Sequence, residues 1–277
     1  MTRVVDFHTH LFPPGAMDEA ALSPLRARGL LHHMADLVCG DGSIEPAQLA
    51  RFFAAEGVAH SVVLAEVTPL TTGISSNEFV GEYCQGVDGL IPFCSPNPYL
   101  ERDPTRAMEH LVSRYGFQGV KLYPSYLPMA PNDARLYPLY AFAQEAGLPV
   151  MFHTGISTFP GSRLKWASPL LLDDVAVDFP ELPIVLAHGG RDLWFHEAFT
   201  LARLHANVYL EVSGLPASRL LQYFPRLATL QGKVLFGTDF PVLPSISAAV
   251  EAVRGLGLPE EVVEDILGGT ARTLLHL

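Results

Sequence analysis

Cysteine is scarce in this sequence: three residues, Cys39, Cys84 and Cys94, are spread over 277 positions. So few and so scattered cysteines exclude a disulfide framework and a zinc ribbon, because both need cysteines paired at regular spacings. We therefore expect these cysteines to be reduced thiols in a cytoplasmic protein.

Basic residues and long apolar runs are also lacking. Lys and Arg number 18 against 29 acidic residues, giving a net charge of −11, and no basic stripe is present. Because phosphate binding needs clustered Lys and Arg, this composition argues against a nucleic acid partner. No apolar run approaches the ~18–20 residues of a membrane span, and the opening MTRVVDFHTH holds no signal-peptide core. We expect a soluble cytoplasmic protein that acts on a small molecule, with its oligomeric state open between a monomer and a homo-oligomer.

A glycine-rich G-x-G-x-x-G turn after the first strand is absent, which argues against an open sheet that binds a dinucleotide. The chain instead contains eight short, nearly continuous apolar runs, as strands buried on both faces of a parallel sheet do. They lie at 3–8, 61–67, 89–95, 119–124, 149–155, 184–190, 208–214 and 234–241. With one helix-length segment after each, they predict an α/β fold: a single-domain (β/α)8 barrel over residues 1–277.

Helices are predicted in the connections by proline at the start and glycine at the end. The segments are 45–57, 104–116, 138–147, 192–205 and 216–232, the last with Pro225 as an expected kink. Residues 11–44 form an unusually long connection, which we interpret as a partly helical lid, with His32 and His33 as candidate substrate contacts.

Polar residues gather where the predicted strands end, which is where barrel enzymes build their active sites. His8 and His10 alternate on the first strand and therefore share one face, with Asp6 deeper in the same strand. Three further candidates end later strands: His153, His188 and Asp239. Histidine nitrogens and carboxylate oxygens without cysteine suit Zn²⁺ or Mn²⁺. We therefore predict a metal site of one or two ions on these five residues.

Other polar residues near the predicted strand ends are candidates for binding the substrate. Lys121 lies within a predicted strand, where a buried ammonium without a partner would be costly. Arg191 follows the sixth strand and could hold a substrate carboxylate with two hydrogen bonds, or form an ordinary ion pair. Tyr123 follows Lys121 closely and is a third candidate lining residue.

The motifs DFHTH, GVKLYP, FHTG, AHGG and GTDFP occur in this order and resemble the amidohydrolase superfamily. The resemblance is greatest to the amidohydrolase-related branch, which contains metal-dependent hydrolases and the aminocarboxymuconate-semialdehyde and resorcylate decarboxylases. It extends to the closing GGTARTLL, where Thr270 stands in place of the asparagine usual in that branch.

The resemblance implies roles for individual residues. His8, His10, His153 and Asp239 would be metal ligands, and Asp239 would also move a proton. His188 would either bind a second metal or polarise the substrate. Lys121 would be either a carboxylated lysine that bridges two ions, as in binuclear members, or a residue that binds a substrate carboxylate.

The expected activity is that of a metal-dependent hydrolase, in which Zn²⁺ or Mn²⁺ activates water to cleave a small organic ester, lactone or amide. Asp239 and His188 are the predicted catalytic residues. The alternative is a lyase: a nonoxidative, metal-dependent decarboxylase of a small unsaturated or aromatic carboxylic acid. A metal-free lactonase on the same scaffold is a third reading.

Overall fold

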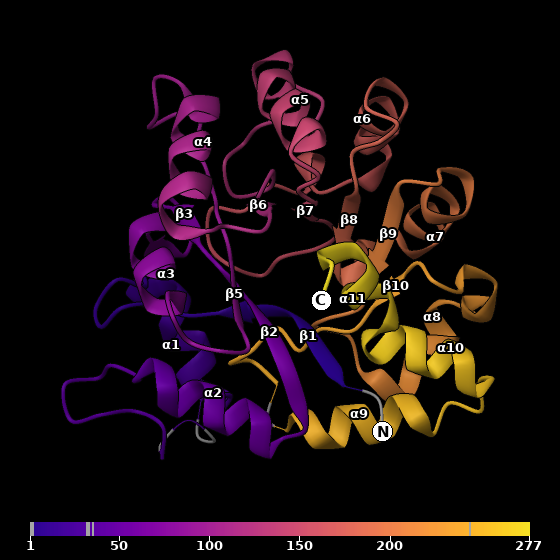
Figure 1. Ribbon diagram of the computed structural model, residues 1–277, viewed down its shortest axis with the longest axis horizontal. Helices are drawn as coiled ribbons and strands as arrows, with labels where there is room; N and C mark the ends of the chain where they lie inside the picture. Colours follow the sequence, from indigo (N-terminus) through magenta and orange to yellow (C-terminus); the bar gives the residue numbers. More distant parts are fainter. Residues whose placement is uncertain (1–2, 32–33, 35, 244) are drawn as a thin grey trace.

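The apolar runs form a closed barrel of parallel strands surrounded by helices (Figure 1). The computed structural model describes residues 3–31, 34, 36–243 and 245–277, so that the two lid histidines, His32 and His33, lie outside the described residues. The barrel strands are β1 (Val4–His10), β2 (Val58–Leu64), β5 (Leu90–Phe93), β6 (Val120–Leu122), β7 (Val150–His153), β8 (Ile184–Ala187), β9 (Val208–Glu211) and β10 (Val234–Leu235). The predicted (β/α)8 barrel is confirmed.

Two hydrogen-bonded sheets, β1-β2-β5 and β10-β9-β8-β7-β6, meet at two seams to close the barrel. At one seam Cys94 pairs with Val120 in parallel. At the other, the first strand meets the last: His10 N donates to Phe240 O over 2.8 Å, and Asp239 N donates to His8 O over 3.0 Å. This second seam brings residues from the two ends of the chain into contact.

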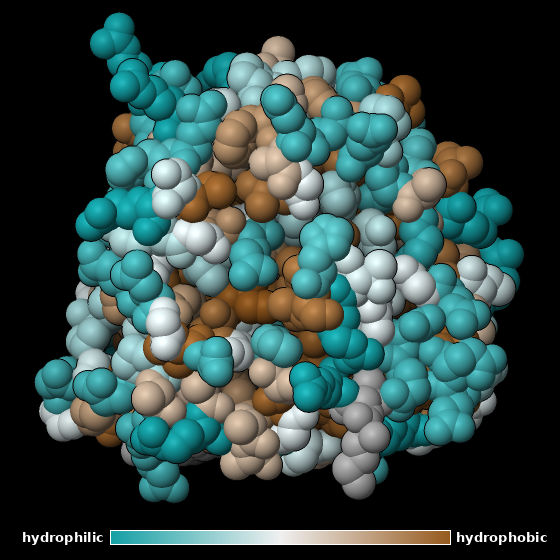
Figure 2. Space-filling view, viewed as in Figure 1, coloured by the Kyte–Doolittle hydropathy of each residue, from teal (hydrophilic) through white to brown (hydrophobic). Residues whose placement is uncertain are grey.

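The barrel interior is filled by apolar side chains, among them Phe7, Phe93 and Met151. Its lower end, where the strands begin, is covered by α11 (Thr270–Leu275), whose Leu274 and Leu275 join this interior cluster. Figure 1 shows α11 near the centre of the ring, and Figure 2 shows apolar side chains in the middle of the same face within a polar surround. The opposite end, where the strands finish, is left for a functional site.

The outer helices include four that the sequence predicts, at 45–57, 104–116, 138–147 and 192–205. The outer helices are α1 (Glu19–Ala27), α2 (Pro46–Ala55), α3 (Asn77–Cys84), α4 (Pro104–Tyr115), α5 (Tyr137–Glu145), α6 (Leu172–Asp178), α7 (Phe195–Leu204), α8 (Leu220–Tyr223), α9 (Ile246–Arg254) and α10 (Glu260–Glu264). The predicted helix at 216–232 is divided: α8 ends at Tyr223, and a 3₁₀ turn occupies Leu227–Leu230. Pro225 causes the break, because the residue before a proline is kept out of helical conformation.

The predicted strand at 61–67 also differs from the structure. β2 ends at Leu64, and Glu66 opens a hairpin of β3 (Glu66–Thr68) and β4 (Gly73–Ser75) above the barrel. The first part of the lid is attached to this hairpin, since Asp18 N donates to Thr72 O over 2.8 Å. Asp18 also caps α1 by accepting from Ala20 N over 2.9 Å. The lid therefore rests on the hairpin beside the upper end of the barrel.

The three cysteines are free, as predicted. Among the described residues, no helix combines the length and the apolar character that crossing a membrane requires.

Candidate metal centre

Three donor atoms meet at the seam between β1 and the segment after β10. His8 Nε2 and His10 Nε2 lie 3.1 Å apart, and Asp239 Oδ1 lies 3.6 Å from the first and 3.5 Å from the second. The alternation of β1 turns both imidazoles to the same side. The barrel seam supplies the carboxylate, which the sequence places more than two hundred positions away.

These distances fit a shared metal ion. Ligand atoms placed about 2.0–2.2 Å from one ion at roughly tetrahedral or octahedral angles lie about 3.0–3.6 Å from each other. Two imidazole nitrogens and a carboxylate oxygen form a donor set that suits Zn²⁺ or Mn²⁺. The residues present therefore fit the metal that the sequence predicts.

Two glutamates that we did not single out in the sequence contact the outer nitrogens of these histidines. Glu66 Oε2 lies 3.0 Å from His10 Nδ1, and Glu211 Oε2 lies 3.2 Å from His8 Nδ1. Both glutamates are buried, and Glu66 also accepts from the hydroxyls of Thr68 and Thr72. A carboxylate on Nδ1 fixes the proton there and directs the Nε2 lone pair towards the ion. In the sequence, each of these glutamates is the only acid in an apolar run, at 61–67 and at 208–214, and this could have marked them as buried partners of the histidines.

His188 stands on the other side of His8, with the two ring centroids 4.8 Å apart. Its Nδ1 lies 3.1 Å from Ser213 O, and since a carbonyl only accepts, Nδ1 carries the proton and Nε2 presents a lone pair. Donor atoms of His8, His188 and Glu211 all lie within 4.8 Å of one another and form a second group able to hold an ion.

His153 lies beside this second group rather than within it. Its ring centroid is 4.7 Å from that of His188 and 4.9 Å from that of Tyr126. Its Nε2 is buried and has no hydrogen-bond partner in the described part of the chain. A buried nitrogen without a partner costs free energy, which indicates that a ligand or ion completes its environment.

Lys121 is fully buried directly below the donor triangle. Its Nζ lies 3.3 Å from His8 Nε2 and 3.3 Å from Met151 Sδ, and no carboxylate of the described residues forms an ion pair with it. Burial lowers the pKa of Lys121 to about 8, although Glu211, Asp239 and Glu66 favour its charged form. The lysine therefore loses its proton far more readily than a surface lysine does.

The two remaining predicted residues line the small cavity above the donor triangle. Tyr123 lines this cavity, and its hydroxyl donates to Ala65 O over 3.0 Å. Arg191 Nε and Nη2 donate to Ile156 O over 3.0 and 2.7 Å. With these two hydrogen bonds made, Nη1 of Arg191 has no hydrogen bond among the described residues. It lies near Gly214 and Asp239.

Burial controls the charges at the centre. It lowers the pKa values of His8, His153 and His188 well below the ordinary value of histidine, so that all three are neutral at pH 7. Burial alone would also lower the pKa of His10, but contacts with Asp239 and Glu66 raise it to about 9. A metal ion on His10 Nε2 would therefore displace a proton.

Asp239 and His188 both have backbone conformations in the left-handed region, with φ of 60° and 63°. Residues other than glycine adopt this region rarely, and such strain concentrates where function requires a particular side-chain direction. Asp6 secures the strained segment: its carboxylate accepts from Thr238 N, Thr238 Oγ1 and His8 N. Asp6 is therefore a buried, hydrogen-bonded structural acid that joins β1 to the segment after β10.

Gly237 has no side chain, which leaves room for the Glu211 carboxylate and the His8 side chain to pack against its backbone. A Cβ built there would lie 2.2 Å from Glu211 Oε1 and 2.9 Å from His8 Cβ. We expect Gly237→Ala to destabilise the protein by about 1–3 kcal/mol, because buried atoms on both sides must move. Urea denaturation measures the change, and Gly40→Ala, whose Cβ meets nothing within 4 Å, is the control. Equal midpoints for the two variants would contradict this packing.

Comparison with known proteins gives consistent results. The sequence matches the amidohydrolase family over residues 5–277. No curated protein matches the sequence. Among solved structures, an uncharacterised TIM-barrel protein from Bordetella bronchiseptica is 26% identical, with a TM-score of 0.79 over 99% of this chain and 98% of that chain.

Two further solved structures share the fold at lower identity. A 2,6-dihydroxybenzoate decarboxylase from Rhizobium is 16% identical, with a TM-score of 0.72 over 100% of this chain and 99% of that chain. A Pseudomonas putida protein to which 2-pyrone-4,6-dicarboxylic acid hydrolase activity is ascribed is 22% identical, with a TM-score of 0.65 over 100% and 98% of the two chains.

Proposed function

This chain belongs to the amidohydrolase family, and from that premise we propose that it is a metal-dependent hydrolase of a small organic ester, lactone or amide. The observation that carries the proposal is the triangle of His8 Nε2, His10 Nε2 and Asp239 Oδ1, with edges of 3.1, 3.5 and 3.6 Å. It opens towards a cavity that Arg191 and His188 also line. A small-molecule substrate would bind there.

The proposed cofactor is Zn²⁺ or Mn²⁺, held by His8, His10 and Asp239, with His153 and His188 as further candidate ligands. An ion of this kind supplies Lewis-acid chemistry: it polarises a carbonyl group and makes water acidic enough to react at neutral pH. The number of ions, one or two, decides the role of Lys121. With two ions Lys121 would be the carboxylated bridge, and with one ion it would contact the substrate or the metal ligands.

The side chains of this protein can perform the proton transfers of hydrolysis. Burial favours the neutral form of Asp239, but the hydrogen bond from His10 and the positive charge of that histidine hold the pKa of Asp239 well below the ordinary value. Asp239 is therefore an anion that can accept a proton from the attacking water and pass it to the leaving group. His188 and Arg191 line the same cavity as Asp239 and could orient the carbonyl or a carboxylate of the substrate.

Arg191 also favours a second candidate function, nonoxidative decarboxylation. A guanidinium with a free Nη1 at the cavity is suited to hold a carboxylate. In that reaction Asp239 would protonate the carbon that loses CO2. The fold similarity to a 2,6-dihydroxybenzoate decarboxylase is compatible with this alternative.

One experiment separates the two functions. The purified protein, with its metal content measured by elemental mass spectrometry, is incubated with a panel of lactones, esters and amides and with a panel of hydroxybenzoates and muconates. We expect turnover in the first panel without CO2 release. Release of CO2 from the second panel alone would establish the decarboxylase instead. Turnover without any bound metal would favour the metal-free lactonase.

Glu66 offers a test of the metal site that does not depend on the substrate. Glu66→Gln keeps the size of the side chain but removes the charge beside His10 Nδ1. We expect the affinity for metal to fall by about 10–100-fold, the usual effect of losing a partner of a metal-binding histidine. Competition with a chelator measures the affinity, and Glu109→Gln on the exposed face of α4 is the control. Unchanged affinity in Glu66→Gln would contradict a metal on His10.

A further inference from the structure

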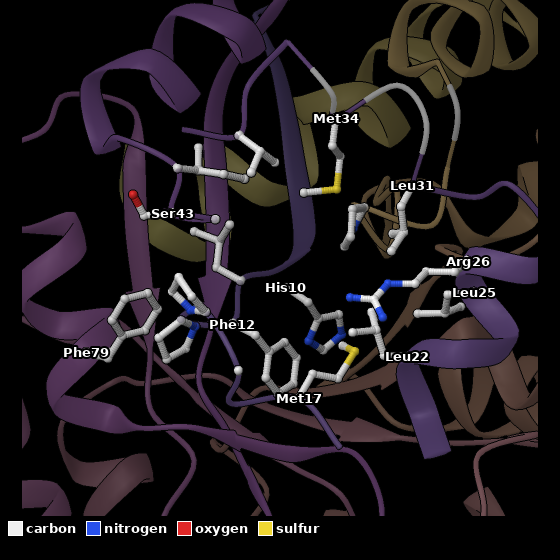
Figure 3. A pocket seen from close by; sticks show the side chains of 18 of the residues that line it. His10, Phe12, Met17, Leu22, Leu25, Arg26, Leu31, Met34, Ser43 and Phe79 are labelled. Carbon is white, nitrogen blue, oxygen red and sulfur yellow. The ribbon is translucent and has the colours of Figure 1, made fainter. Parts of the chain in front are cut away.

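A second, larger cavity adjoins the candidate metal centre beneath the lid. It measures about 410 Å³, whereas the cavity above the donor triangle measures about 60 Å³. Figure 3 shows its walls: Leu22 and Leu25 come from α1, Leu31 and Met34 from the segment after it, and Phe79 from α3. We call this space the lid chamber. Its volume lies in the range of cavities that bind small organic molecules.

The walls of the lid chamber are apolar, and the few polar groups on them have partners. The Tyr83 hydroxyl donates to Ile44 O over 2.8 Å. Arg26 also lines the chamber, where its Nη1 donates to Glu19 over 3.2 Å and its side chain is 60% exposed. Among the described lining residues, no other Lys, Arg, Asp or Glu is present. A charged ligand group placed against the apolar walls would therefore lose its hydration, and Arg26, the only Lys, Arg, Asp or Glu among the described lining residues, is already paired with Glu19.

The lid chamber adjoins the cavity above the donor triangle, because the two share part of their lining. His10, Phe12, Met17, Leu25 and Pro241 line both cavities. His10 stands at the junction, with Nε2 in the donor triangle and its ring at the chamber floor (Figure 3). A space of about 60 Å³ holds only a few atoms beyond the reacting group. For a larger substrate that reacts at the centre, the lid chamber is the adjoining space on the far side of His10.

From this adjacency and from the apolar walls of the lid chamber we infer that the substrate carries an uncharged apolar substituent, an alkyl chain or an aromatic ring, and that the lid chamber binds it. The inference rests on the proposed function, because it places the reacting group at Asp239 and His10. If the inference is correct, the protein prefers substrates with long apolar substituents to compact acids with several charges. A cavity lined with cations would have the opposite preference. Burial of the substituent would supply binding free energy roughly in proportion to its apolar surface.

The first test measures binding without metal chemistry. Primary alcohols from 1-butanol to 1-octanol are titrated into the protein by calorimetry. We expect affinity to increase with chain length, by at most about fourfold per methylene at full burial. Met34→Trp should abolish this increase, because the indole would occupy the chamber. Leu204→Trp introduces the same side chain at an exposed site on α7 and should leave the increase intact.

The alcohol series decides whether the chamber binds apolar groups, whatever reaction the protein catalyses. An affinity independent of chain length would overturn the inference. So would an identical dependence on chain length in Met34→Trp and Leu204→Trp.

The second test measures whether binding in the lid chamber increases the rate of hydrolysis. γ-Butyrolactone and γ-nonalactone share the ring but differ by a five-carbon side chain, and we expect kcat/KM to be about tenfold or more higher for the longer one. Met34→Trp should remove most of this difference. Equal kcat/KM values would overturn the substituent preference while leaving the hydrolase in place. If the metal-loaded protein turns over neither these lactones nor any member of the ester and amide panel, but the alcohols bind as expected, the proposed hydrolase is contradicted while the binding role of the lid chamber is retained.

Discussion

The double variant His8→Ala/His10→Ala is expected to lose its bound metal and, with it, activity. The two imidazoles provide two of the three donor atoms in the triangle, whose Nε2 atoms lie 3.1 Å apart. Because losing a single partner of a metal-binding histidine costs about 10–100-fold in affinity, losing two ligands should cost more than about 100-fold. Elemental mass spectrometry after dialysis should find metal in the parent protein and almost none in the variant, and turnover should fall to background.

The control for this experiment removes two histidines from the surface. His110 and His196 are exposed on α4 and α7, and His110→Ala/His196→Ala should keep both metal and activity. Circular dichroism of both variants establishes that the barrel is intact. Full metal content in His8→Ala/His10→Ala would show that the ion, if one is bound, lies elsewhere, and the proposed mechanism would fail with it.

Asp239→Asn should separate proton transfer from metal binding. The amide retains an oxygen that can face the ion, and asparagine tolerates the left-handed backbone, with its φ of 60°, that this position requires. It cannot accept a proton from water. We therefore expect kcat, corrected for metal content, to fall by about 10²–10⁴-fold, the usual contribution of a general acid–base residue.

Asp192→Asn is the matched control, since Asp192 also has a left-handed backbone, with φ of 70°, but is exposed beside the site. Its kcat should stay close to that of the parent protein. Should Asp239→Asn retain its metal and its kcat, another group must move the proton, and His188 would be the next candidate to test.

The sequence was sufficient to predict the barrel because each strand is buried on both faces. Such strands need apolar side chains in continuous runs, and the run at 184–190, for example, includes the whole of β8. Short strands with helices between them leave few alternatives to a closed parallel barrel. Positions at strand ends followed from this topology, which is why His8, His10 and Asp239 could be grouped before their distances were known.

Contacts between side chains from distant elements could not be predicted in the same way. Glu66 and Glu211 are acids in apolar surroundings, but only the folded chain shows which histidine each one contacts. The β3–β4 hairpin begins where the sequence continues in apolar and β-branched residues, so the turn at Ala65 gave no local signal. Helices α3, α6 and α9 were missed because tertiary packing, more than capping residues, determines where they begin and end.

The seam between β1 and the segment after β10 has a consequence for biosynthesis. His8 leaves the ribosome more than two hundred residues before its partner Asp239. Until then a nascent chain has an unpaired edge along β1, and it can bind a metal ion only with an incomplete set of ligands. An ion that binds both segments holds the two ends of a long loop together. The conformational entropy that this loop loses when the barrel closes would then be offset by metal binding. Metal supply during synthesis would thus influence how much of the protein reaches the closed barrel.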